Sequence, residues 1–297
     1  MDKVIFRNKL AIGDNLVFTV ALRELHEQFP DRYQTGVLSY YPEIYENNPY
    51  VENFTKEEAK NILVIDVNYS RDFKSKRLSG KHFANGYITC LNNVFGLDIE
   101  LTNCHPEIYL DFNEINEAKN IMEKNNITEK CWLISPAIKQ DIPLKNYSAY
   151  RWQRLVSELY DVGVEIVQTG DVNSINPKLK NIKSLVGKLN LREYFAMASL
   201  CRGMIGHVSL QTHLAAAFKK PCITINGGRE NINWYSYPNQ QFLHSVGMLE
   251  CCKDSGCWLK NIQDCHNFDM ANGIAKCMQL IDVRQIVDIV MKYENNL

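Results

Sequence analysis

The sequence predicts an α/β fold made of two Rossmann-like, doubly wound domains that face each other across a cleft. Short apolar runs of strand length alternate with segments of helical periodicity, and this alternation restarts near the middle of the chain. Strands that alternate with helices form parallel βαβ units. A chain of 297 residues, of which 45% are apolar, is also long enough to bury the cores of two domains.

The first domain is expected over residues 1–127. The short strand "KVIF" is followed by a helix whose apolar residues recur at helical spacing until Pro30 ends it. The further strands are "TGVLSY" and "NILVIDV", and the further helices are "HFANGYITCLNNVFG" and "NEINEAKNIMEKN". The polar, aperiodic stretch "NNITEK" is the expected joint to the next domain.

The second domain is expected over residues 128–281, and a terminal helix over 282–297. The strands of this domain are "CWLIS", "VEIVQTG", "GMIG" and "PCITING", and its helices are "SAYRWQRLVSELYDVG", "NLREYFAMASLC" and "SLQTHLAAAF". Asp282 is the expected cap of the terminal helix, whose apolar face carries Val283, Ile286, Val287 and Val290.

Charge and hydropathy exclude several classes of protein. The 33 Lys and Arg residues nearly balance the 34 Asp and Glu residues, so no overall positive field attracts nucleic acid or anionic lipid. No apolar run reaches the roughly 18 residues of a membrane span, and the first residues do not resemble a secretory signal. We therefore expect a cytoplasmic protein without integral membrane contact. The absence of a G-x-G-x-x-G sequence argues against a nicotinamide cofactor.

Asp14 is the candidate catalytic residue. Gly13 and Asp14 follow the first strand, and the carboxyl ends of strands are where such folds place their ligands. A carboxylate there can remove the proton of an acceptor hydroxyl, which accelerates a reaction by about 10²–10⁴-fold. The same position suits an ordinary N-cap of a helix that begins at Asn15 or Leu16, and the residues alone favour the cap.

The helix "SLQTHLAAAF" is a candidate phosphate site. Ser209 is its expected N-cap, with Thr212 and His213 in the first turn. Hydroxyls and amides at a helix N-terminus bind phosphate without a metal, and His213 adds a donor. An ordinary capped helix with a buried histidine explains the residues equally well.

The loop "NGGREN" follows the last clear strand and is a second candidate for donor binding. Gly227 and Gly228 form a turn, Arg229 is able to hold a phosphate bidentately, and Glu230 is able to accept a hydrogen bond from a ribose or sugar hydroxyl. A plain glycine-rich turn is nearly as good an interpretation.

Half of the ten cysteines lie within residues 251–277. Four thiolates from Cys252, Cys257, Cys265 and Cys277 could hold a structural zinc or iron ion tetrahedrally, with Cys251 or His266 as substitutes. Such a closed shell leaves no position for a substrate, so no catalytic metal is expected. Unrelated buried thiols are an equal alternative, because the spacing is looser than in paired C-x₂-C motifs.

Three segments, taken in order, carry a family resemblance. They are "GDNLVFTVALRELHEQFPD" with the later "NNPYV", "SPAIKQDIPLKNYSAYRWQRLVSEL", and "SLVGKLNLREYFAMASLCRGMIGHVSLQTHLAAAFKKPCITING". With these segments the chain resembles glycosyltransferase family nine, the heptosyltransferase-like enzymes of GT-B architecture, over nearly its whole length. The resemblance implies an N-terminal acceptor domain, a C-terminal domain that binds a nucleotide-diphosphate sugar, and a transfer that inverts the anomeric centre.

The resemblance also implies roles for individual residues. It places the general base on Asp14 and favours phosphate binding at the helix that begins after Ser209. Lys145, which lies 7 residues before Trp152, matches the family's cation for the leaving diphosphate, and Lys139 is a weaker substitute. A subset of such proteins also shares the cysteine cluster.

Two residues depart from the family pattern. Val208 stands where the family commonly has an acidic or amide residue, and Leu210 stands where it has a glycine that allows the backbone to approach phosphate. These departures favour a third interpretation, a non-catalytic protein that binds sugar nucleotides.

We therefore expect an inverting glycosyltransferase with a nucleotide-diphosphate sugar as donor, ADP-linked heptose by analogy. The acceptor is a hydroxyl of a glycan, a protein or a modified nucleic acid, and the sequence does not choose among them. The size of the sugar and the oligomeric state also stay open. A GT-B nucleotide-sugar epimerase is the alternative enzyme, because that class shares the architecture but needs no acceptor.

Overall fold

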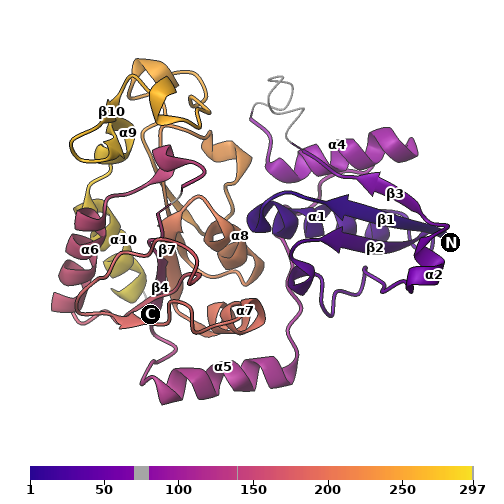
Figure 1. Ribbon diagram of the computed structural model, residues 1–297, viewed down its shortest axis with the longest axis horizontal. Helices are drawn as coiled ribbons and strands as arrows, with labels where there is room; N and C mark the ends of the chain where they lie inside the picture. Colours follow the sequence, from indigo (N-terminus) through magenta and orange to yellow (C-terminus); the bar gives the residue numbers. More distant parts are fainter. Residues whose placement is uncertain (70–79, 139, 296–297) are drawn as a thin grey trace. The chain divides into compact units, whose positions relative to one another are not determined.

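A computed structural model describes residues 1–69, 80–138 and 140–295, which divide into two compact units (Figure 1). The first unit comprises Met1–Asp111 together with Asn233–Tyr237, and the second comprises the rest of the described chain. Each unit has a parallel sheet with helices around it, so the predicted α/β class is confirmed. No helix in these residues is long and apolar enough to cross a membrane.

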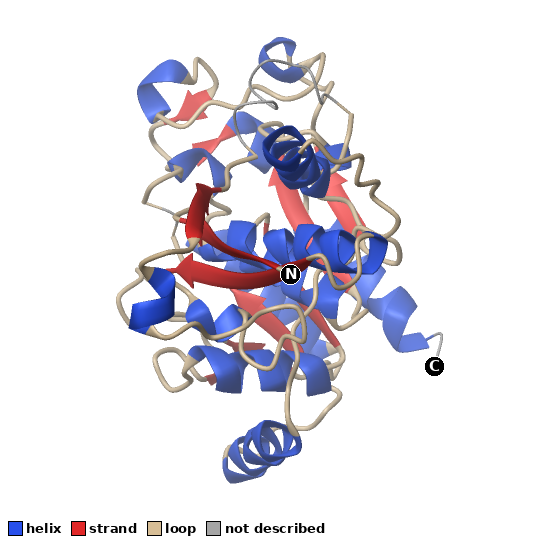
Figure 2. Cartoon of the chain, turned by 90° about the vertical axis from the view of Figure 1, so that its right-hand side faces the viewer, coloured by secondary structure: helices blue, strands red, loops and turns tan. Residues whose placement is uncertain are grey.

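The first unit is built on a three-stranded parallel sheet of order β2-β1-β3. The strands are β1 (Asp2–Asn8), β2 (Tyr33–Ser39) and β3 (Leu63–Asp66). The N-terminus lies at the start of the central strand (Figure 2). Because the chain leaves β1 toward one neighbour and later returns on its other side, the carboxyl end of β1 is a switch point of the kind where α/β folds bind ligands.

The helices of the first unit include two that bury large apolar faces. These two are α1 (Ile12–Gln28) and α4 (Phe83–Phe95), and the short segments η1 (Pro42–Ile44) and α2 (Lys56–Ala59) lie between them in the chain. Phe18 of α1 packs edge to face on Phe6 of β1, with ring centroids 5.5 Å apart. Gly96 ends α4 in the left-handed conformation, with φ of +64°, that glycine adopts without strain.

The second unit is built on a six-stranded parallel sheet of order β6-β5-β4-β7-β8-β9. The strands are β4 (Trp132–Ser135), β5 (Ile166–Gln168), β6 (Lys183–Ser184), β7 (Gly203–His207), β8 (Cys222–Gly227) and β9 (Gln241–His244). This is the strand order of dinucleotide-binding folds, and its direction reverses between β4 and β7. The carboxyl ends of β4, β7 and β8 therefore surround the expected ligand position.

Several helices and short segments surround the six-stranded sheet. They are α5 (Phe112–Lys124), η2 (Pro143–Lys145), α6 (Ala149–Asp161), α7 (Leu191–Leu200), α8 (Leu210–Ala217), η4 (Glu250–Cys252), η5 (Ile262–Asp264), the antiparallel pair β10 (Phe268–Asp269) and β11 (Ile274–Ala275), α9 (Lys276–Gln279) and α10 (Val283–Asn295).

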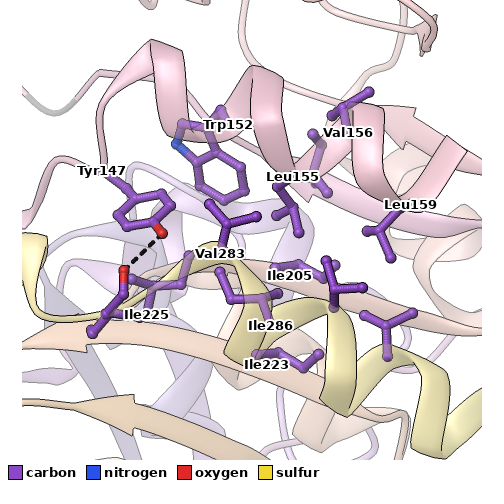
Figure 3. Packing of buried hydrophobic residues seen from close by; sticks show 14 of the residues in the cluster. Tyr147, Trp152, Leu155, Val156, Leu159, Ile205, Ile223, Ile225, Val283 and Ile286 are labelled. Carbon is purple, nitrogen blue, oxygen red and sulfur yellow. Dashed lines mark hydrogen bonds between the residues drawn. The ribbon is translucent and has the colours of Figure 1, made fainter. Parts of the chain in front are cut away.

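Helices α6 and α10 cover one face of the second sheet and bury its largest apolar cluster (Figure 3). Trp152 and Leu155 of α6 and Ile286 of α10 lie above Ile205 and Ile223 of the strands, and all five are buried. The predicted apolar face of the terminal helix is buried as expected. Asp282 caps this helix as predicted, since its carboxylate accepts a hydrogen bond of 2.8 Å from the amide of Arg284.

The boundary between the units differs from the prediction. Helix α5 groups with the second unit, so the boundary follows Asp111 and does not lie near residue 127. Arg192 of α7 binds Glu114 of α5 through two nitrogens, at 2.5 and 2.7 Å. This bidentate pair attaches α5 to α7 of the second unit, although the break in the sequence pattern comes after α5.

The segment Asn233–Tyr237 belongs to the first unit although it follows β8 in the chain. It includes the end of η3 (Ile232–Trp234). The ring of Tyr237 lies 4.8 Å from that of His82, and the ring of Trp234 lies 6.0 Å from that of Phe83. These aromatic contacts fix the segment against the start of α4.

Candidate functional site

The start of α1 places Asp14 at the switch point of the first sheet. The helix begins at Ile12 after Ala11, so the predicted start at Asn15 or beyond is wrong, and Gly13 lies within the helix. Asp14 is the third helical residue, and its Oδ2 accepts a hydrogen bond of 3.2 Å from the amide of Ala11. Asp14 therefore satisfies an N-terminal amide from within the first turn, as the acidic residue of a capping box does.

Two tyrosines hold Asp14 from other elements. The hydroxyl of Tyr69, which follows β3, donates to Oδ1 of Asp14 at 2.8 Å. The hydroxyl of Tyr87, within α4, donates to the main-chain oxygen of Asp14 at 3.0 Å. Burial first, and the nearby negative charge of Asp14 second, raise the pKa of Tyr87 well above its ordinary value, so this hydroxyl stays a donor.

The backbone beside Asp14 is anchored by Asn15. Oδ1 of Asn15 accepts hydrogen bonds from Ser39 at the end of β2, at 2.7 Å, and from the hydroxyl of Tyr45, at 3.0 Å. Its amide nitrogen donates to the carbonyl of Leu10 at 2.9 Å. Elements after all three strands thus converge on the first turn of α1, and they leave the Asp14 carboxylate little freedom to rotate.

Lys145, Glu230 and the start of α8 come together at the switch point of the second sheet. Lys145 follows β4, and its Nζ lies 2.8 Å from Oε1 of Glu230, which follows β8. The same nitrogen donates to the carbonyl of Val208, which follows β7, at 3.3 Å. The side chains of Lys145 and Glu230 are only 13% and 4% exposed. The other predicted cation, Lys139, lies outside the described residues.

Arg229 is buried and paired within the protein, and its role as a bidentate phosphate ligand stays a prediction. Its guanidinium pairs with Oε1 of Glu230 and lies 4.6 Å from the centre of the Trp258 ring. Its Nε donates to the carbonyl of Leu259 at 2.6 Å. Arg229 therefore holds Glu230 in place from beneath, a role that the sequence did not suggest because Trp258 lies far along the chain.

Only one of the two carboxylate oxygens of Glu230 has partners among the described residues. Oε1 is close to both Lys145 and Arg229, whereas Oε2 is buried and has no hydrogen-bond partner among the described residues. A buried carboxylate oxygen without a donor is costly, by about 1–3 kcal/mol or more. A ligand hydroxyl that donates to Oε2 would remove this cost.

Gly227 and Gly228 of the loop 226–231, the predicted donor loop, each lie where the structure requires a glycine. Gly227 has φ of +64°, and a register shift in β8 just precedes it. A Cβ atom on Gly228 would lie 2.7 Å from Sγ of Cys252 and 3.2 Å from Cβ of Cys277. The predicted donor-binding role of these glycines stays untested, but the structure gives them a different reason to be glycine.

The first turn of α8 carries three of the predicted donor-binding residues. Ser209 is the N-cap as predicted, but its hydroxyl donates to the carbonyl of His207 at 3.2 Å and does not cap the helix. Thr212 is fully buried, with its hydroxyl 3.2 Å from that of Thr224, and His213 is 4% exposed. Thr212 and His213 are thus both buried, and their roles in phosphate binding stay predictions.

The cysteines of residues 251–277 lie close to one another in space. Cys252 and Cys277 are buried beneath Gly228, Cys257 and Cys265 are half-buried, and Cys251 is exposed. Burial first, and then the nearby thiols, raise the pKa of Cys277 to about 11. Within the described ranges, no group of three or more His, Cys, Asp or Glu side chains is arranged to hold a metal ion. The metal site stays a prediction.

The sequence matches a family model over most of its length. The family model described as "Glycosyltransferase family 9 (heptosyltransferase)" matches residues 54–262, more than two thirds of the chain. A search of the curated proteins finds none that matches.

Solved structures share the whole fold at low identity. A glycosyl transferase family 9 protein from Veillonella parvula DSM 2008 has a TM-score of 0.72 and 16% identity, with 100% of this chain and 99% of that chain covered. Heptosyltransferase II from E. coli has a TM-score of 0.64 and 10% identity, with 99% and 100% covered. The dodecameric, iron-containing heptosyltransferase TibC from enterotoxigenic E. coli, in complex with ADP-D-β-D-heptose, has a TM-score of 0.65 and 14% identity, with 99% and 76% covered.

Proposed function

The chain belongs to glycosyltransferase family 9, the heptosyltransferase family, and from that premise we propose that it transfers a sugar from a nucleotide-diphosphate sugar to a hydroxyl acceptor with inversion. Asp14 is the general base of this reaction. The second unit binds the donor, and the first unit supplies the base.

The observation that carries the donor assignment is the convergence of Lys145, Glu230 and the start of α8 at the switch point of the second sheet. Lys145 provides a compact positive charge, and the first amides of α8 provide N–H donors, a combination suited to a diphosphate. Oε2 of Glu230 is suited to accept a hydrogen bond from a ribose or sugar hydroxyl.

Asp14 takes the proton of the acceptor. As the acceptor oxygen bonds to the anomeric carbon, the bond from that carbon to the diphosphate breaks and the hydroxyl proton passes to the Asp14 carboxylate. A single displacement of this kind inverts the anomeric centre. The hydrogen bonds from Tyr69 and Ala11 support the assignment, because they fix the orientation of the carboxylate.

An ADP-linked heptose is the donor we propose first. The structure of TibC, which shares this fold, holds ADP-D-β-D-heptose. The family description names heptosyltransferases as well. The acceptor is a hydroxyl of a glycan, a protein or a modified nucleic acid, and all three are tested.

We further propose that Cys252, Cys257, Cys265 and Cys277 hold a structural zinc or iron ion. Two of these thiols are packed together beneath Gly228, all four are free, and thiolates are the ligands that both metals accept. TibC is an iron-containing member of the same fold. Elemental analysis of freshly purified protein is expected to find about one metal ion per chain, and a content near zero would reject the site.

A panel of nucleotide sugars with and without hydroxyl acceptors tests the function. We expect nucleotide release that depends on an acceptor, fastest with ADP-heptose, and a product whose anomeric configuration, measured by NMR, is inverted. Isomerisation of the donor without acceptor would instead establish an epimerase. Donor binding without turnover by any acceptor would establish a binding protein, and retention of configuration would exclude the single displacement.

A further inference from the structure

Trp258 adopts a backbone conformation that is rare for a large side chain. Its φ is +53°, in the left-handed region that mainly glycine and asparagine occupy. The residue is only half-buried, so filling a core does not explain it. Strain of this kind persists where the surroundings demand a particular geometry, and it gathers at ligand sites.

The geometry that this conformation provides is a tight pairing with the donor loop. The amide of Trp258 donates to the carbonyl of Arg229 at 2.9 Å, and the amide of Cys257 donates to the carbonyl of Gly228 at 3.2 Å. In the other direction, Nε of Arg229 donates to the carbonyl of Leu259. Three successive residues of the cysteine segment thus bind two successive residues of the loop.

The side chain of Trp258 also contacts the loop. Its face lies 4.6 Å from the Arg229 guanidinium, an attractive contact between a cation and an aromatic quadrupole. Arg229 in turn pairs with Oε1 of Glu230, which also holds Lys145. The orientation of the Glu230 carboxylate, and with it the place of Oε2, therefore depends on where the guanidinium is held.

We propose that Trp258 is a positioning residue for the nucleotide donor: it seats Arg229 so that Glu230 and Lys145 are preorganised for binding. This proposal rests on the proposed function, because it assumes that Glu230 and Lys145 meet the donor. It makes residues 251–277 part of the donor site through contact with its loop, whether or not a metal is bound there. Donor affinity then depends on this segment.

The test measures ADP binding by isothermal titration calorimetry. Trp258→Leu keeps an apolar side chain but removes the aromatic face, and we expect the Kd for ADP to rise about tenfold. Trp258→Phe keeps a weaker aromatic face and is expected to lose only about threefold. Met270→Ala is the matched control, since Met270 is a highly exposed apolar residue of the same segment, and we expect the Kd of this variant for ADP to stay at the wild-type value.

A double-mutant cycle separates positioning from a general structural effect. In a Glu230→Gln background, Trp258→Leu is expected to add little further loss of affinity, because it acts through Glu230. Independent, multiplying effects would overturn the proposal, as would wild-type affinity in Trp258→Leu. If Trp258→Leu does not fold by circular dichroism, Trp258→Phe and its cycle decide the matter. Failure of the wild type to bind ADP would overturn the donor assignment itself, a result distinct from wild-type affinity in the variant.

Discussion

His82 gives the first unit a built-in sensitivity to acid. It caps α4 with its ring, because Nδ1 accepts a hydrogen bond of 3.2 Å from the amide of Ala84. Burial first, and the charge of His105 second, lower the pKa of His82 to about 3. A protonated ring would lose the capping bond and bring a charge into the aromatic contact with Tyr237.

The sign and size of the effect follow from linkage. An unfolded histidine has a pKa near 6.5, so between about pH 6.5 and 3 the unfolded chain binds a proton that the folded chain does not. The free energy of unfolding therefore falls as the pH falls through this window, by about 1.4 kcal/mol per pH unit. At pH 5 the loss from His82 alone amounts to about 2 kcal/mol relative to pH 7.

His82→Asn removes the titration and keeps the cap, since an asparagine side chain accepts the same amide. We expect the variant to lose some stability at pH 7, because the ring contact with Tyr237 disappears, but to gain about 2 kcal/mol on the wild type by pH 5. The assay is amide hydrogen exchange of α4 peptides as a function of urea, which reports on the first unit alone. If the difference in the free energy of unfolding between wild type and variant is the same at pH 7 and pH 5, His82 is not buried in its neutral form.

Three other substitutions, one of them with a matched control, test separate contacts. Tyr69→Phe removes the hydrogen bond to the Asp14 carboxylate and is expected to lower kcat by about tenfold or more. Its matched control, Tyr87→Phe, removes a hydrogen bond to the Asp14 main chain and is expected mainly to lower the free energy of unfolding, by about 1 kcal/mol. Equal losses of kcat in the two variants would contradict a special role for the bond to the carboxylate. Gly228→Ala is expected to destabilise the second unit by about 1–3 kcal/mol in thermal melts, because the new Cβ meets Cys252, and an unchanged melt would show that the thiol moves aside. Lys145→Met is expected to raise the Kd for ADP about tenfold in calorimetry, and wild-type affinity would remove Lys145 from the donor site.

The fold was predictable because its signals are local. Alternating strand and helix patterns over both halves indicate parallel sheets, and the structure confirms them, with the same strand order as dinucleotide-binding folds in the second unit. The boundary was not predictable from the break at residues 125–130, because the bidentate contact of Glu114 with Arg192 joins residues far apart in the chain. Tertiary contacts of this kind leave no periodic pattern.

The candidate site was predictable only in part, because some of its contacts join residues far apart in the chain. Glu230 was expected after the last clear strand and Lys145 from its spacing to Trp152, and the structure brings them within 2.8 Å. The role of Arg229 was missed because its partner Trp258 lies in a segment without regular structure. Tyr69 was missed although it follows β3 at the same sheet edge as Asp14; asking which polar residues follow each strand of that sheet would have found it.

The central claim is that one carboxylate on the first unit activates the acceptor for a donor bound by the second. The most direct measurement compares acceptor-dependent ADP release from ADP-heptose by the wild type and by Asp14→Asn, alongside the Kd of each for ADP. We predict that the substitution lowers release by about 100-fold or more and leaves the Kd unchanged. Release at the wild-type rate by Asp14→Asn would contradict the account.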